Sequence, residues 1–334
     1  MNICHRLVRL IATLAVCLMP ATAPAQIPQF DSLYVFGDSL VDNGNLFALT
    51  KTLRMEPAIP PSQHPFQTYF EGRFSNGYVG VEYLWQRLSG HAPGSDRGLK
   101  PFFRSFRGNT AAVDFGFGGT GTPYLDQTPG GEWAPGLKGQ VELFRISLRG
   151  RKPSRHALYA IATGANDYRN DPFNVPMQPP EVVGNVIDSI VTLYHLGARH
   201  VMVFDLPDLG LIPANSGNPE PASQISALHN LILENALNDL QAQLPELRLI
   251  QIKLDSLFRD LLPRLESQVP ALALLGPPGT VVCLFVDPSL CQDVPPTLFN
   301  RLDLGFLFWD IVHPTTEVHS ILGDYVYDRL ANSY

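Results

Sequence analysis

The sequence predicts an α/β protein in which helices flank a mostly parallel sheet. Short runs of β-branched and aromatic residues alternate with longer apolar runs at helical spacing, which is typical of a parallel sheet with crossover helices. The chain also has 334 residues, of which 45% are hydrophobic and 16% are charged. It can therefore bury a large core, and its composition excludes a disordered or collagen-like protein.

The expected elements follow from these patterns in chain order. Buried strands are expected at 33–36, 111–115, 157–162, 200–204 and 247–252. Apolar residues at helical spacing predict one helix over 182–194 and, less regularly, another over 225–240. A last helix is expected over 316–330, with Thr315 or Thr316 as its N-cap. We find no repeat and no linker that would divide the chain, so we expect one domain.

The first 25 residues have the layout of a secretory signal peptide. Arg6 and Arg9 precede an apolar run over 10–19 that is too short to span a bilayer, and Ala23-Pro24-Ala25 is typical of a cleavage site. The alternative is a buried N-terminal helix. We therefore expect a signal peptide over 1–25, a mature domain over 26–334, and export to the periplasm or the medium.

The charge of the chain bears on its partners. Lys and Arg number 24 against 31 Asp and Glu, a net charge of −7. We see no basic run interleaved with aromatic residues. Nucleic acid is therefore not an expected partner.

Of the four cysteines, Cys283 and Cys291 would remain after cleavage. Export to an oxidising compartment predicts a local disulfide between them, and the alternative is two free buried thiols. Two cysteines alone cannot form a closed zinc site. The surrounding residues 276–304, like residues 50–67, are rich in proline and are expected as long loops. One hypothesis is that the Cys283–Cys291 segment, with Leu284, Phe285, Leu298 and Phe299, forms an apolar flap beside a binding site. The alternative is a structural loop pinned by the disulfide.

A candidate nucleophile follows the first expected strand. In the segment 36–40 (FGDSL) a glycine permits a sharp turn, and Ser39 falls at the carboxyl end of the strand, where α/β sheets bind ligands. Gly-Asp-Ser is also common in plain turns and helix caps. A serine hydroxyl needs an adjacent base to become a nucleophile, so the next question is which histidine could supply one.

His313 has the setting that suits a base. Asp310 precedes it by three residues, close enough on a tight turn to accept a hydrogen bond from one ring nitrogen and leave the other free. Pro314 disfavours the α region for His313, so the pair is expected in a loop just before the last helix. The alternative is an ordinary surface hydrogen bond.

Two further loops could stabilise an oxyanion. Residues 116–121 (GFGGTG) offer backbone N–H groups after the second expected strand, and Asn166 offers a side-chain amide after the third. Each segment could also be a simple turn. A parallel sheet would bring these loops to one edge, which favours a joint site. The glycines also match a nucleotide-binding pattern, but Pro123 follows at once and no helix opens there, so that interpretation fails.

Together these segments resemble the GDSL or SGNH lipase/acylhydrolase family. Residues 36–45 (FGDSLVDNGN) resemble its first motif block, 164–167 (GAND) its third, and 310–315 (DIVHPT) its fifth. The second block is altered to DFGFGGT at 114–120, which keeps the oxyanion glycine as Gly118. Family-like segments also occur at 72–77, 206–210 and 308–310, so the resemblance spans nearly the whole mature chain.

The resemblance implies a three-layer α/β/α sandwich around a central, mostly parallel, five-stranded sheet of flavodoxin-like type. It implies Ser39 as the nucleophile, His313 as general base and then acid, and Asp310 as the residue that orients the imidazole. The oxyanion hole would consist of the backbone N–H groups of Ser39 and Gly118 and the side chain of Asn166. Neither a cofactor nor a metal is expected.

The activity that the resemblance implies is acyl-ester hydrolysis through an acyl-enzyme. Residues 72–77 and 308–315 are most similar to exported bacterial lysophospholipase and glycerophospholipid:cholesterol acyltransferase members. A lipid substrate is therefore expected, with room for acyl transfer to a sterol and for contact with a membrane surface; the oligomeric state stays open. The alternatives are a short-chain carboxylesterase for choline or carbohydrate acetyl esters, a metal-dependent phosphoesterase, and a silent lipid- or glycan-binding module. A two-metal site needs several histidines, and the sequence has one that is well placed.

Overall fold

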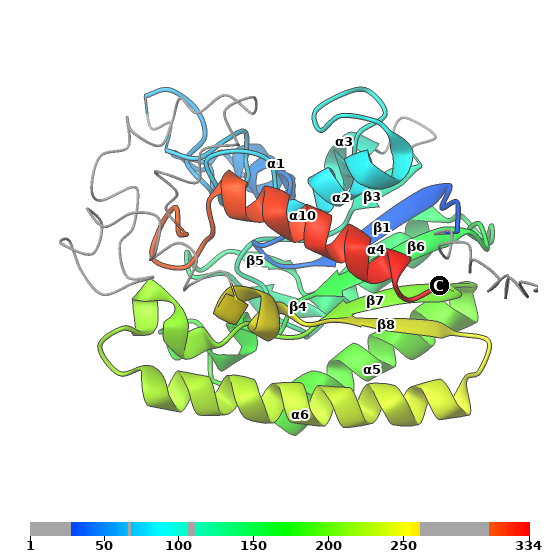
Figure 1. Cartoon of the computed structure of the whole chain (residues 1–334). Coiled ribbons are helices and arrows are strands. Elements are labelled where there is room, and N and C mark those ends of the chain that lie inside the picture. Colours follow the sequence, from blue (N-terminus) through cyan, green and yellow to red (C-terminus); the bar gives the residue numbers. More distant parts are fainter. Residues whose placement is uncertain (1–27, 66–67, 106–110, 261–306) are drawn as a thin grey trace, which may run out of the picture.

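A six-stranded parallel sheet lies at the centre of the molecule, between two layers of helices (Figure 1). The computed structural model describes residues 28–65, 68–105, 111–260 and 307–334. The expected signal peptide over 1–25 and the expected Cys283–Cys291 disulfide lie outside these residues, as does the whole proline-rich segment 276–304. The predicted signal peptide, the disulfide and the flap therefore stay predictions.

The sheet confirms the predicted α/β class and its flavodoxin-like strand order. Its strands run in the spatial order β2-β3-β1-β6-β7-β8, and each neighbouring pair is parallel. Their bounds are Lys100–Pro101 (β2), Ala112–Asp114 (β3), Ser32–Gly37 (β1), Ala157–Ala162 (β6), His200–Phe204 (β7) and Arg248–Ile252 (β8). All five expected strands form. The expected count of five is wrong because β2 adds a sixth strand at the edge, and a two-residue strand that contains proline leaves no strand pattern in the sequence.

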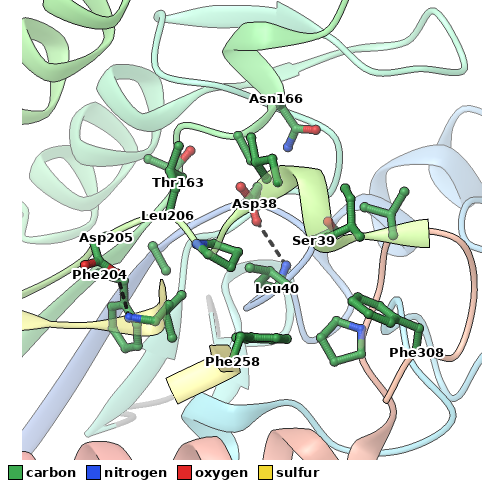
Figure 2. A pocket seen from close by; sticks show the side chains of 18 residues that line it. Asp38, Ser39, Leu40, Thr163, Asn166, Phe204, Asp205, Leu206, Phe258 and Phe308 are labelled. Atoms are coloured by element: carbon green, nitrogen blue, oxygen red, sulfur yellow. Dashed lines mark hydrogen bonds between the residues drawn. The ribbon is translucent and has the colours of Figure 1, made fainter. Parts of the chain in front are cut away.

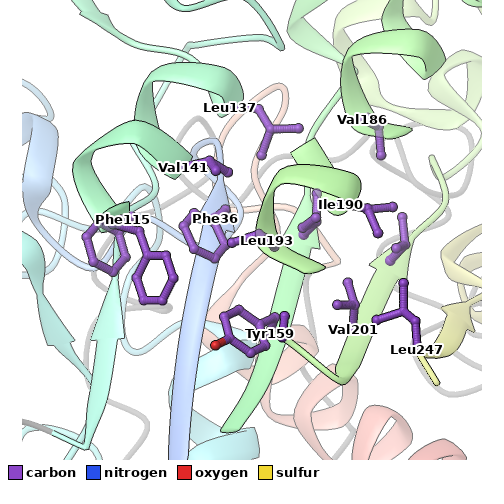
Figure 3. Close-up of a cluster of buried hydrophobic side chains, with 14 of the residues drawn as sticks. Phe36, Phe115, Leu137, Val141, Tyr159, Val186, Ile190, Leu193, Val201 and Leu247 are labelled. Carbon is purple, nitrogen blue, oxygen red and sulfur yellow. The ribbon is translucent and has the colours of Figure 1, made fainter. Parts of the chain in front are cut away.

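Side chains alternate between the two faces of the strands, which explains why both faces are covered. On one face, Phe36, Tyr159 and Val201 pack with residues of α4 (Leu137–Ser147), α5 (Pro179–Leu196) and α6 (Pro219–Gln243) (Figure 3). On the other face, Val35, Ala160 and Met202 pack with α2 (Gly80–Ser89) and α10 (Thr316–Ala331). The three predicted helices correspond to α5, α6 and α10, and Thr315 is the N-cap of α10. The three-layer sandwich is confirmed.

Shorter elements connect these layers. They are α1 (Asn45–Thr52), α3 (Phe102–Ser105), the antiparallel pair β4 (Leu125–Gln127) and β5 (Trp133–Pro135), and the short 3₁₀ helices η1 (Asn166–Tyr168), η2 (Leu209–Leu211) and η3 (Pro213–Asn215). Within the described part of the chain, no helix has both the length and the apolar character needed to cross a membrane. Because the sheet is parallel, the segments that follow β1, β3, β6 and β7 all leave it at the same edge.

Candidate active site

Ser39 lies directly beyond β1 and forms a hydrogen bond with His313, 274 residues away in the chain: Ser39 Oγ and His313 Nε2 are 2.8 Å apart. Two hydrogen bonds hold the backbone of the turn before Ser39, one to the N–H group and one to the carbonyl of Gly37. Gly37 N–H donates to Gln140 Oε1, and Gln140 Nε2 donates to the Gly37 carbonyl, each over 2.8 Å. Gln140 belongs to α4, so the helix layer holds the turn that presents Ser39.

Asp310 and His313 occupy a tight turn just before α10, as the sequence predicts. His313 Nδ1 and Asp310 Oδ2 are 2.7 Å apart, and the N–H groups of Val312 and His313 each donate to Asp310 Oδ1 over 2.7 Å. The turn is closed by a bond of 2.7 Å from Trp309 N–H to the His313 carbonyl. Both ring nitrogens of His313 are therefore engaged, one with Asp310 and one with Ser39.

The ionisation of Asp310 decides the direction of these two bonds. Burial by itself would raise the pKa of Asp310, but the hydrogen bond and charge of His313, with further donors from Tyr69 and Val312, lower the pKa to about 2. The carboxylate is therefore ionised at neutral pH and only accepts hydrogen bonds. It follows that His313 Nδ1 donates to Asp310. In the neutral imidazole Nε2 then accepts from the Ser39 hydroxyl, which is the arrangement a general base requires.

Asn166 begins η1, in the segment that follows the end of β6 at Ala162, and lines the same pocket as Ser39. Its Nδ2 donates to the Thr120 carbonyl over 3.1 Å, which leaves the second N–H of the amide for another acceptor. The following residue ties this turn to the glycine segment: the Asp167 carboxylate accepts from Thr122 N–H at 2.9 Å and from Thr122 Oγ1 at 2.6 Å. The structure thus brings Asn166 to the site that contains Ser39, as expected.

Gly118 does not fit its expected role. Its N–H group donates to Asp42 Oδ2 over 2.8 Å, so it is not free for an oxyanion. The buried Asp42 carboxylate also accepts from the N–H groups of Gly44, Asn45 and Leu46, and it needs these bonds because it is removed from water. A glycine is needed at 118 for another reason, since a Cβ there would overlap the ring of Phe74.

The next residue, Gly119, has a left-handed backbone conformation, which Gly118 does not adopt. Its φ of +75° lies in the region that favours glycine, and its carbonyl accepts from Arg169 Nη1. Arg169 also donates from Nη2 to the Gln127 carbonyl over 2.8 Å. Among the hydrogen bonds between described residues, none uses the N–H group of Gly119.

An apolar pocket opens beside Ser39 (Figure 2). Its walls come mostly from the segments that follow β1, β6 and β7, from the helical residues 254–260 and from the segment before α10. Figure 2 shows Asn166 and Phe258 on opposite sides of it, with Phe308 near the Ser39 side. Asp38 is a buried polar group in this wall, and burial raises its pKa to about 7. Over the described residues, no three His, Cys, Asp or Glu side chains come together as metal ligands would.

Sequence reasoning missed two contributors, Gln140 and Tyr69. Gln140 is a fully buried polar residue on the stripe of α4 that also carries Leu137, Val141 and Phe144. A glutamine at such a position is the signal that could have marked it. Tyr69, whose hydroxyl donates to Asp310 Oδ2 over 2.7 Å, lies three residues before the family-like segment 72–77. Nothing in its local pattern points to Asp310.

Comparison with known proteins found a matching family profile, similar curated proteins and similar solved structures. The profile of the family described as GDSL-like Lipase/Acylhydrolase matches residues 33–326. A phosphatidylcholine-sterol acyltransferase of Aeromonas hydrophila is 27% identical over 333 residues, which cover 89% of each chain. A GDSL esterase/lipase of Arabidopsis thaliana is 25% identical over 346 residues, covering 94% of this chain and 92% of that one. A solved structure of a G-D-S-L family lipolytic protein from Veillonella parvula covers 88% of this chain and 94% of that one, with 11% identity and a TM-score of 0.42.

Proposed function

Because the chain belongs to the GDSL-like lipase/acylhydrolase family, and is therefore a carboxylic ester hydrolase, we propose that it cleaves acyl esters of lipids with Ser39 as the nucleophile. The observation that supports this proposal most directly is the chain of hydrogen bonds from Asp310 through His313 to Ser39. These three side chains have the contacts that nucleophile, base and orienting group need.

The proposed reaction has two halves. His313 Nε2 takes the proton of Ser39 Oγ as the oxygen attacks the ester carbonyl carbon, and the resulting imidazolium returns that proton to the departing alcohol oxygen. This leaves an acyl group on Ser39. A water molecule, activated by His313 in the same way, then attacks the acyl carbon, which releases the acid and restores Ser39. An acceptor alcohol in place of water would give an ester, which is the acyltransferase variant.

The oxyanion donors are part of the proposal. We assign the role to the backbone N–H of Ser39, the amide of Asn166 and the N–H of Gly119, in place of the Gly118 N–H that bonds to Asp42. Donors of this kind stabilise the charge that develops on the carbonyl oxygen in the transition state.

The substrate proposal is supported by the pocket. Its apolar walls beside Ser39 suit an acyl chain, so we propose lysophospholipase, phospholipase A or lipase activity, with transfer to a sterol as an added activity. The relative from Aeromonas hydrophila is a phosphatidylcholine-sterol acyltransferase. A short-chain carboxylesterase is the second candidate, because the pocket wall also contains Asp38 and Thr163. Export by the predicted signal peptide would bring the enzyme to such lipids outside the cytoplasm, where it could contact membrane surfaces.

The test compares the purified mature protein with Ser39→Ala. Both are incubated with p-nitrophenyl esters of increasing chain length, with diacylphospholipids and with lysophospholipids, with and without a chelator. We expect chelator-resistant release that Ser39→Ala abolishes and that increases with chain length. A preference for acetyl esters would favour the short-chain esterase. Equal activity of Ser39→Ala and parent would refute the nucleophile, and loss of activity with chelator would favour a metal-dependent phosphoesterase.

A further inference from the structure

The Asp310 carboxylate has a side-chain partner besides His313. The Tyr69 hydroxyl donates to Asp310 Oδ2 over 2.7 Å, and the same oxygen accepts from His313 Nδ1 at 2.7 Å. The other oxygen, Oδ1, accepts from the N–H groups of Val312 and His313. Each carboxylate oxygen thus accepts two hydrogen bonds. Of these four bonds between described residues, the one from Tyr69 comes from a distant part of the chain.

Tyr69 is itself held in place. Its N–H group donates to the Pro61 carbonyl over 2.9 Å. Its ring meets the ring of buried Trp309 edge-on, with centroids 6.5 Å apart, and that of Phe74 at 6.1 Å. Burial raises the pKa of Tyr69 above its usual value, and the charge of Asp310 raises it further, so the phenol stays protonated and remains a donor at neutral pH.

The residues after Tyr69 contact the same turn. The Phe74 ring lies against the His313 ring, with centroids 5.0 Å apart and planes tilted by 38°. Ser75 Oγ donates to the Pro314 carbonyl over 2.9 Å, and Asn76 Oδ1 accepts from Thr316 N–H over 2.8 Å. Ring contacts and side-chain bonds to the backbone therefore hold this segment as a whole. Among the described residues, only Tyr69 and His313 bond to Oδ2 of Asp310.

We propose that Tyr69 is a positioning residue, whose hydroxyl holds Asp310 Oδ2 in the orientation that directs His313 toward Ser39. This inference rests on the proposed function of Ser39, His313 and Asp310. A carboxylate that lost this donor would keep its backbone bonds at Oδ1 but would be free to shift Oδ2 with respect to the imidazole. Misorientation of the base slows the proton transfers and leaves substrate binding unchanged.

The test variant is Tyr69→Phe, which removes only the hydroxyl. Tyr83→Phe is the matched control, because Tyr83 also hydrogen-bonds to the C-terminal segment, at Thr316 Oγ1 over 2.9 Å, without touching Asp310. We expect Tyr69→Phe to lower kcat about tenfold with KM nearly unchanged. Tyr83→Phe should keep kcat within about twofold, whatever either variant does to the melting temperature.

A double-mutant cycle shows whether the effect passes through Asp310. In the Asp310→Ala background, Tyr69→Phe should change kcat by less than about twofold, because the group on which it acts is gone. An equal tenfold loss in both backgrounds would overturn the proposal, and so would an unchanged kcat for Tyr69→Phe in the parent. A rise in KM alone would also overturn it, since that would place Tyr69 in substrate binding.

Ser39→Ala separates this inference from the proposed function. If Ser39→Ala is inactive and Tyr69→Phe retains full kcat, the positioning role fails and the serine mechanism stands. If Ser39→Ala is as active as the parent, the mechanism fails and the positioning role fails with it.

Discussion

At the scale of single residues, the turn that presents Ser39 is fixed by a close approach. A Cβ at Gly37 would overlap the carbonyl oxygen of Ala162 on the neighbouring strand β6, so only glycine lets β1 and β6 pair up to this point. The buried Gln140 amide then satisfies both backbone groups of Gly37. The backbone that presents Ser39 to His313 is therefore held in place.

Asn166 supports a prediction at this scale. Replacement by alanine should lower kcat by roughly 10²–10³, because one oxyanion donor is lost, and should leave KM nearly unchanged. Steady-state kinetics with a soluble ester measures both constants, and a melting curve checks that Asn166→Ala is folded. An unchanged kcat in a folded variant would remove Asn166 from the oxyanion hole.

At the scale of elements, a buried ion pair fastens the residues that follow Tyr69 to helix α2. Arg73 donates to Glu82 through Nε and Nη2, each over 2.7 Å, and the side chains of Arg73 and Glu82 are only 7% and 0% exposed. The guanidinium also lies over the rings of Phe70 and Tyr78, at 5.4 and 5.0 Å from their centroids. The planar guanidinium of arginine donates to both oxygens of Glu82 at once, and lysine does not provide this geometry.

Arg73→Lys should therefore lower the free energy of unfolding by about 2–4 kcal/mol, because it leaves a buried carboxylate partly unpaired. Arg87→Lys is the control, since the Arg87–Asp324 pair spans 3.3 Å with side chains 50% and 58% exposed. That change should cost less than about 1 kcal/mol. Urea unfolding of the three proteins measures the difference, and equal midpoints for the two variants would contradict it.

At the scale of the whole molecule, buried carboxylates make stability depend on pH in an unusual direction. Burial raises the pKa of Asp38 to about 7 and the pKa values of Asp167 and Asp205 to about 6. A carboxyl with a raised pKa stabilises the fold below its unfolded pKa, and this contribution is lost as the pH rises through its folded value. Burial lowers the pKa of His229 to about 4, which acts in the opposite direction: its contribution is present above the unfolded value and falls away in acid.

Asp205→Asn isolates one of these groups. Only Oδ1 of Asp205 accepts hydrogen bonds in the described structure, from the N–H groups of Leu254 and Asp255, and the asparagine carbonyl can replace it. Relative to the parent, the variant should gain roughly 1–3 kcal/mol of stability between pH 4 and pH 8, because it no longer buries a charge at high pH. Urea titrations at several pH values measure this, and parallel pH curves for the two proteins would disprove it.

The sequence by itself determined the α/β class, the five longer strands and the three main helices. It also named Ser39, Asp310, His313 and Asn166 as candidates, and the structure brings these residues to one pocket and its neighbouring turn. Strand and helix patterns are local, because burial of one face repeats every few residues, and the motif residues fall at strand ends that a parallel sheet brings together. Only the tertiary structure decided that Gly118 bonds to Asp42, and that Gln140 and Tyr69 support the turns of Ser39 and Asp310. The physical reason is that each of these hydrogen bonds joins groups 76, 103 or 241 residues apart in the chain, and no local pattern encodes that they meet within about 3 Å.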